Sequence, residues 1–158
     1  MSNNMGTIPQ YGGTFCLAKA GLGEATTTAG AIKVAAPNGA GVDFCIDGNL
    51  YHKADTDDIA VTAAAVQADL TTCLYLVCLN ASGTLSTVKG DAVLTADLAA
   101  GTAVLEWPRP AAGTCPIGAV KVATSGATFT AGTTDLGAAG VTDTYYDMFT
   151  IPSAQLTA

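Results

Sequence analysis

Two strand-forming runs with a turn sequence between them predict a β-hairpin at residues 42–53. Val42–Ile46 and Asn49–Lys53 are two short runs of strand-forming residues, and Asp47-Gly48 separates them. Asp-Gly suits the positive φ angles that a two-residue hairpin turn requires. The pattern therefore predicts two antiparallel strands joined by a tight turn.

A second hairpin is predicted around the continuously apolar run at residues 73–79. A strand without polar positions is expected where both faces of a sheet are covered. The sequence NASG at residues 80–83 then supplies the turn, and TLSTV at residues 84–88 supplies the returning strand.

A third hairpin is predicted at residues 116–131, where PIGAVKVA turns at residues 124–126 into ATFTA. Successive side chains of a strand point to opposite faces, so the odd-numbered positions 117–123 are expected on one face. Val120 and Val122 are expected on the other face. The Thr and Val content favours strands, and the glycines mark turns.

Two further segments fit a helix as well as a strand. Residues 57–70, DDIAVTAAAVQADL, begin with aspartates suited to an N-cap and contain a run of alanines, but their first apolar residues alternate. We favour a strand because the surrounding chain is β, and residues 92–101 show the same ambiguity. Residues 107–113, WPRPAAG, are predicted to form a loop because proline cannot donate to a β-ladder.

These elements predict an all-β fold, a compact antiparallel β-sandwich or barrel of short hairpins with a partly extended N-terminal arm. The predicted division is an arm or attachment segment at residues 1–41 and a β-rich body at residues 42–158. The alternative is that residues 14–17 and 31–34 are ordinary strands of the same body.

The composition is poor in charge and rich in small residues. The chain has 158 residues, of which 12% are charged, and its mean hydropathy is +0.39 with only 6% aromatic residues. An average soluble domain is roughly 25% charged. A monomer relies on surface charge to stay apart from its neighbours, so this composition favours assembly into an oligomer.

The net charge of −7 argues against nucleic acid and against a membrane as partners. Nucleic-acid binding calls for a basic stripe, whereas Arg109 is the only arginine and no two basic residues are adjacent. The N-terminal sequence has no basic region followed by an apolar run, so no signal peptide is predicted. We expect the protein to be made in a cytoplasm.

Residues suited to catalysis, cofactor binding or metal binding are scarce, and none is predicted for any of these roles. The five cysteines, Cys16, Cys45, Cys73, Cys78 and Cys115, form no CxxC motif and are expected to be buried free thiols. His52 is the only histidine. The sequence Asp55-Thr-Asp57-Asp58 faintly resembles a calcium-binding loop but lacks the glycine and glutamate that such a loop needs.

Residues 42–136 resemble a group of tailed-bacteriophage virion proteins that includes small capsid decoration proteins and head fibres or spikes. The segments that carry the resemblance are FCIDGNLYHKADTDDIAVTAAAVQ, TTCLYLVCLNASGTLSTVKGD and RPAAGTCPIGAVKVATSGATFTAGTTDL. They match the patterns I-x-G-x-L-Y, Y-L-V followed by N-A-S-G-T, and P-I-G-x-V-x-V followed by G-T-T-x-L. The resemblance implies a β-rich, often multimeric structural protein on the virion surface, without catalytic residues.

The expected function is therefore that of a capsid decoration, or cement, protein that binds the lattice of the major capsid protein. We expect capsid attachment through the N-terminal segment, with Phe15, Leu17, Lys19 and Lys33 as contact residues. The alternative is a head or tail fibre or spike protein that adheres to the host surface. The best ligand-contacting patch for that alternative is TDTYYDMFT at residues 142–150.

Overall fold

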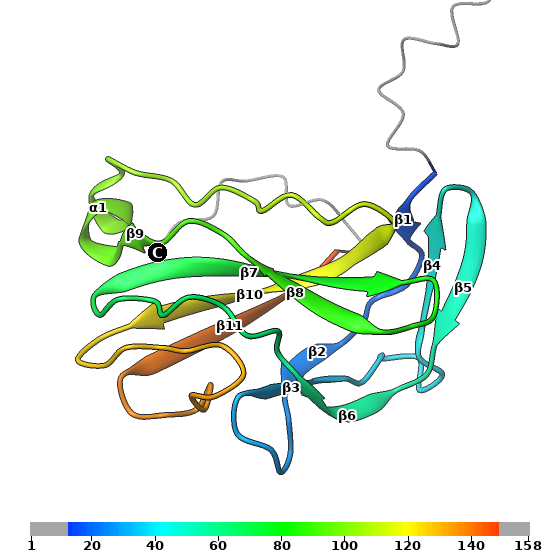
Figure 1. Cartoon of the computed structure of the whole chain (residues 1–158), viewed down its shortest axis with the longest axis horizontal. Helices are drawn as coiled ribbons and strands as arrows, with labels where there is room; N and C mark the ends of the chain where they lie inside the picture. The colour runs from blue at the N-terminus through cyan, green and yellow to red at the C-terminus, as the bar shows by residue number, and fades with distance from the viewer. Residues whose placement is uncertain (1–12, 149–158) are drawn as a thin grey trace, which may run out of the picture.

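The structure, a computed structural model, describes residues 13–148. Strands dominate this part of the chain, and one short helix interrupts them (Figure 1). The elements are β1 (Phe15–Cys16), β2 (Leu22–Glu24), β3 (Ala31–Val34), β4 (Val42–Ile46), β5 (Asn49–Lys53), β6 (Thr56–Ala60), β7 (Thr71–Asn80), β8 (Leu85–Lys89), β9 (Val93–Leu94), α1 (Thr95–Ala100), β10 (Thr114–Thr124) and β11 (Val141–Asp147).

The strands form three antiparallel sheets that pack together. The largest sheet has the order β11-β10-β7-β8, with β9 paired to one end of β7. The two smaller sheets have the orders β1-β4-β5 and β2-β3-β6. The predicted all-β class is confirmed, and the packed sheets correspond to a sandwich, because no closed barrel is found in the described part of the chain.

The largest sheet has two covered faces. Tyr75 and Val77 of β7 point into the main core, which they share with Phe44 of β4 and Ile32 of β3. Leu74 points to the opposite face, where a smaller cluster contains Leu98, Leu105 and Ala119. The two small sheets thus cover one face, while α1 and the loop that follows it lie across the other (Figure 1).

The predicted hairpin at residues 42–53 is confirmed with the expected strand ends. Asp47 and Gly48 have φ angles of 50° and 84°, as a two-residue turn of this kind requires. The hairpin of the apolar run is confirmed as β7 and β8, and all positions of residues 71–79 are buried.

The prediction of an arm extending to residue 41 is wrong for residues 13–41. β1 pairs with β4, and β3 pairs with β6, so this part of the chain belongs to the sheets. Ile32 and Val34 are almost completely buried, and their burial is what draws the segment into the core. Residues 1–12 of the predicted arm lie outside the described residues.

The third predicted hairpin has the wrong partner strand. β10 pairs with β11 and with β7, whereas Phe129 forms only an isolated bridge to Gln67. The predicted faces also fail at one position. A bulge between Pro116 and Gly118 shifts the register, so Ile117 joins the main core on the same side as Val120.

The two ambiguous segments resolve differently. Residues 56–60 form β6, and residues 61–70 continue without a helix, so the preference for a strand holds only for the start of the segment. Residues 92–101 instead contain α1, which ends at Gly101 in the left-handed conformation. The predicted loop at residues 107–113 contains no strand or helix.

Side-chain hydrogen bonds of Gln67 connect the irregular segment 61–70 to the largest sheet. Its side chain is completely buried, and its Nε2 atom donates to the carbonyl oxygens of Thr71 and Val122, each at 3.0 Å. Its Oε1 atom accepts a hydrogen bond from the Tyr75 hydroxyl at 3.2 Å. A buried amide with three satisfied hydrogen bonds joins this segment to both β7 and β10.

Replacing Gln67 with Ala is expected to lower the free energy of unfolding by about 2–3 kcal/mol, because the Tyr75 hydroxyl loses its partner and a cavity remains. Chemical denaturation measures this change. The matched control is Val66→Ala, since Val66 is 58% exposed and its truncation should leave stability almost unchanged. Equal effects of the two substitutions would contradict the role given to Gln67.

Candidate functional site

An exposed apolar row crosses the sheet β1-β4-β5. Phe15 pairs with Cys45, and Cys45 pairs with Leu50, so the three side chains lie on one face of the sheet. Cys45 is buried, but Phe15 is 50% exposed and Leu50 is 72% exposed. Leu17, which is 42% exposed, continues from β1 and donates its backbone N–H to the Asp43 carbonyl. We call Phe15, Leu17 and Leu50 the apolar face.

A polar contact lies in the next row of the same sheet. Asp43 and His52 pair across β4 and β5, and Asp43 Oδ1 lies 2.8 Å from His52 Nδ1. Both side chains are more than half exposed. An exposed pair of this kind contributes little to stability. The pair adds a polar boundary to the apolar face.

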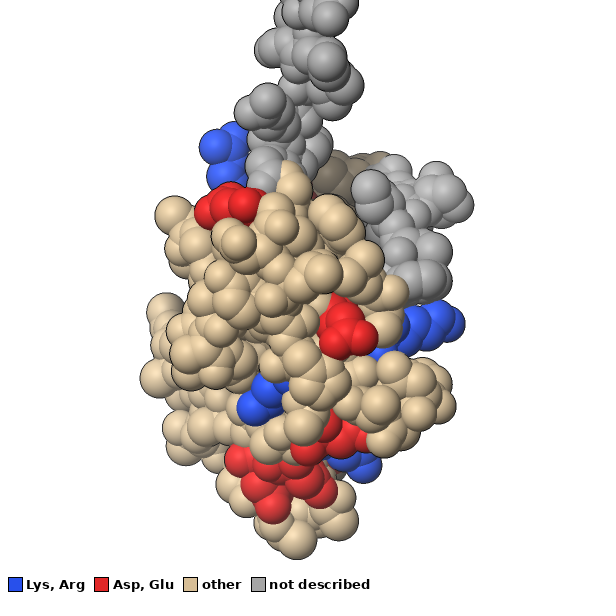
Figure 2. All heavy atoms as spheres, turned by 90° about the vertical axis from the view of Figure 1, so that its right-hand side faces the viewer, with Lys and Arg blue, Asp and Glu red and all other residues tan. Residues whose placement is uncertain are grey.

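The side of the molecule that carries β4 and β5 is largely uncharged. Figure 2 looks onto this side and shows a surface made mostly of uncharged residues, with acidic side chains gathered toward its lower end. Such a surface has little charge repulsion to prevent contact with another protein.

The four predicted attachment residues do not form one patch. Phe15 and Leu17 belong to the apolar face, and the exposed Lys19 follows two residues later. Lys33 instead lies on β3, where it lines a shallow hollow with Asp55 and Asp57. Strand pairing separates it from the others, because β3 belongs to a different sheet from β1.

Sequence reasoning missed Leu50. The signal was present, since alternation along β5 gives Leu50 the opposite face from Tyr51, whose ring stacks on Phe44 with the ring centroids 5.7 Å apart. An apolar residue at the outward position of a hairpin was therefore visible. That Phe15 lies in the same row depends on the β1–β4 pairing, which no local pattern reports.

The aspartates of the calcium-like sequence bind backbone amides. Asp58 accepts hydrogen bonds from the backbone N–H groups of Thr27 and Thr28 at 3.3 and 2.8 Å. It also accepts a hydrogen bond from the Thr27 hydroxyl at 2.6 Å, and this contact is the main cause that lowers its pKa. Asp57 accepts a hydrogen bond from the backbone N–H of Thr26 at 3.1 Å. These carboxylates hold the turn between β2 and β3 against β6.

Acidic side chains also join β2 to the chain around β11. Glu24 accepts a hydrogen bond from the Gly137 backbone N–H at 2.9 Å, and Asp147 accepts one from the Leu22 N–H at 3.3 Å. Tyr145 packs against the main core, and burial together with the nearby Asp143 carboxylate raises the pKa of its hydroxyl. In the sequence TDTYYDMFT, Tyr145 thus contributes to packing, while residues 149 and 150 lie outside the described residues.

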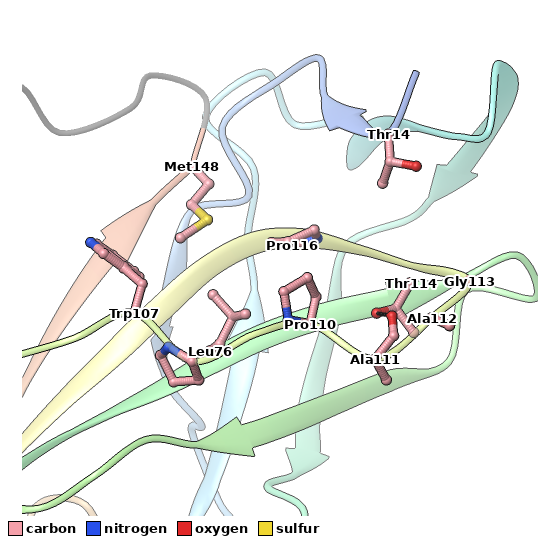
Figure 3. A pocket seen from close by; sticks show the side chains of 11 residues that line it. Thr14, Leu76, Trp107, Pro110, Ala111, Ala112, Gly113, Thr114, Pro116 and Met148 are labelled. Atoms are coloured by element: carbon pink, nitrogen blue, oxygen red, sulfur yellow. Dashed lines mark hydrogen bonds between the residues drawn. The ribbon is translucent and has the colours of Figure 1, made fainter. Parts of the chain in front are cut away.

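A second surface feature is an apolar groove of about 430 Å³ between β10 and the loop at residues 107–113. Leu76 and Pro116 form its floor, and Trp107 and Pro110 form one wall. Figure 3 shows Met148 across the groove from Trp107, at the same end, and Thr14 lies farther along the groove. None of the described residues that line it carries a charge.

The thiols are protected by burial. Cys45, Cys73, Cys78 and Cys115 are buried and Cys16 is half-buried, and all five are free. Burial raises the pKa of Cys78 to about 11 and that of Cys115 to about 12, so neither forms appreciable thiolate at neutral pH. Cys73 and Cys78 point to opposite faces of β7, and of the two only Cys73 belongs to the main core.

Comparison of the chain with protein-family models, with curated proteins and with solved structures finds no match. Over residues 13–148, no three His, Cys, Asp or Glu side chains are arranged to hold a metal ion. The same residues include no helix of the length and hydrophobicity needed to cross a membrane.

The cysteines are expected to be reduced and dispensable. Replacing any one buried cysteine with Ala should cost about 1–2 kcal/mol of stability and no specific function. In the native protein a thiol reagent should modify Cys16 first and leave Cys115 unmodified until denaturant is added. A disulfide between any two of them, found by non-reducing mass spectrometry, would contradict this expectation.

Proposed function

We propose that the protein is a non-enzymatic structural protein of a tailed-bacteriophage virion, namely a capsid decoration protein. In this role it forms a homo-oligomer, for which we propose a trimer, and binds the lattice of the major capsid protein to stabilise the head. The observation that carries the proposal is the apolar face on β1-β4-β5, together with the sequence resemblance of residues 42–136.

The apolar face suits a protein partner better than a small molecule. Phe15 and Leu50 are large, lie in one row and are at least half exposed. Large side chains grouped in this way on a soluble protein are typical of interaction surfaces. The row is open rather than enclosed, so it can be covered by another flat surface but cannot surround a substrate.

A regular lattice would compensate for the small size of this face. One face with three large side chains gives only modest affinity on its own. An oligomer that places several such faces on neighbouring capsid subunits converts the later contacts into intramolecular ones and raises the overall affinity by orders of magnitude. This argument favours an oligomer over a monomer.

The charge distribution supports a protein partner in preference to nucleic acid or a membrane. The six basic residues are spread over separate parts of the structure, namely the segment after β1, the strands β3, β5, β8 and β10, and the loop at Arg109. A spread of this kind gives no continuous basic stripe to follow a phosphate backbone.

The lack of reactive groups in the described chain supports a structural role. His52, the one histidine, is paired with Asp43 on an open surface, and the buried thiols of Cys78 and Cys115 have raised pKa values. A nucleophilic mechanism needs an activated nucleophile beside a base and donors for the developing charge.

Charged substitutions on the apolar face are expected to weaken head binding. Phe15→Asp and Leu50→Asp should each lower the affinity for undecorated heads about 10-fold or more, because each removes a large apolar contact and adds a charge to the interface. Co-sedimentation of the purified protein with the heads measures the affinity.

The matched control for these variants is Val66→Asp, which adds the same charge at an exposed apolar residue away from this sheet. It should bind as the unmodified protein does. Equal binding by all three variants would refute attachment through the apolar face. Labelling of the protein on the tail of intact virions, instead of the head, would favour the fibre or spike alternative.

Removal of residues 1–12 is expected to leave the fold intact but to reduce coating of undecorated heads, because we propose that this segment adds contacts to those of the apolar face. Every described strand begins after residue 13, so the three sheets should form without this segment. Circular dichroism and thermal unfolding check the fold, and electron microscopy of mixed heads checks the coating. Normal coating by the shortened protein would place attachment entirely in the β body.

A further inference from the structure

The described chain ends at the apolar groove beside Trp107. Met148 is the last described residue, and its side chain forms part of the groove wall (Figure 3). Its backbone N–H donates to the Ile117 carbonyl oxygen at 3.0 Å, which fixes the chain end beside β10. Residue 149 therefore follows directly from the wall of the groove.

We propose that the groove is the binding site for the chain's own last ten residues, 149–158, bound within the same molecule. This inference is independent of the proposed function, because it concerns the completion of one subunit. The bound segment would cover the floor of Leu76 and Pro116 and shield the indole of Trp107.

The chemistry of the segment matches that of the groove. Its sequence, FTIPSAQLTA, has no charged side chain and contains Phe149, Ile151 and Leu156. Phe149 and Ile151 point to the same side of an extended chain, since side chains alternate along it. The groove has an uncharged, mostly apolar lining, so it offers burial to these side chains without leaving a charge unpaired.

The reach of the segment is sufficient. Ten extended residues span at most about 33–36 Å, and the segment starts at the groove, so no linker is needed. A tethered segment also binds at a high effective concentration, which allows modest contacts to hold it in place.

The N-terminal segment is less suited to the groove. The N-terminal segment meets the groove at Thr14, which lies away from Trp107 and Met148 (Figure 3). The Gly13 carbonyl oxygen accepts a hydrogen bond from the Gly48 N–H at 3.3 Å, which holds this start of the described chain at the turn between β4 and β5. The two residues next to this anchor are Gly12 and Tyr11, so no aliphatic side chain lies beside it. The C-terminal segment instead places Phe149 directly after a wall residue.

Trp107 provides a specific reporter because it is the only tryptophan of the chain. The chain ending at Met148 is expected to show a red-shifted Trp107 emission and several-fold stronger quenching by acrylamide than the full chain. In the full chain, the double variant Phe149→Asp/Ile151→Asp should reproduce both changes. The double variant Ser153→Asp/Thr157→Asp carries the same added charge at small polar positions and should change neither.

Two further experiments identify the segment that occupies the groove. Addition of the synthetic peptide FTIPSAQLTA to the shortened chain should restore the blue-shifted emission. Removal of residues 1–12 should leave the emission of Trp107 unchanged. The proposal is overturned if neither the shortened chain nor the Phe149→Asp/Ile151→Asp variant changes the emission, or if removal of residues 1–12 exposes Trp107 instead. It is also overturned if the emission of the full chain depends on protein concentration, which would indicate a segment supplied by a second copy.

Discussion

The continuous burial of β7 is the constraint on which the rest of the structure depends. Residues 71–79 have no outward-facing position, so both faces of the strand must be covered by other parts of the chain. The pairing with β10 on one side and β8 on the other satisfies the backbone, and the two small sheets cover one face. Among residues 13–148, the cover of the second face consists of α1, Val93, Leu105 and the loop at Trp107. This thinner cover explains why the apolar groove is on that side.

Small residues allow the layers to approach one another closely. Gly118 shows the reason at one position, because a Cβ atom there would lie 2.4 Å from both the Leu22 side chain and the Tyr146 carbonyl oxygen. Any larger residue would push β2 away from β10 and open the main core. Packing within the subunit thus requires glycine at this position. Small residues that suggest assembly can therefore be required instead for packing within the subunit.

The accuracy of sequence-based prediction in this chain depends on the distance between paired residues. The hairpin at residues 42–53 was predictable because Asp47-Gly48 encodes the turn locally, and β7 with β8 was predictable because the apolar run and the turn are adjacent. The pairing of β10 with β11 was not predictable, because residues 125–140 separate the strands and Phe129 offered a nearer apparent partner. The position of Ile117 failed for a different reason, since a single bulge reverses the alternation that the prediction assumed.

The same distinction applies to the candidate surfaces. Phe15, Leu17 and Leu50 could each be read as apolar and outward from local sequence, but their meeting on one face depends on the pairing of β1 with β4, some thirty residues apart in the chain. Lys33 carries the same charge as Lys19, yet the pairing of β3 with β6 places Lys33 in another sheet. Local chemistry thus identifies the side chains suited to contact, whereas strand pairing decides which of them can act together. A surface made of ordinary apolar side chains therefore depends on the fold, because strand pairing brings those side chains together.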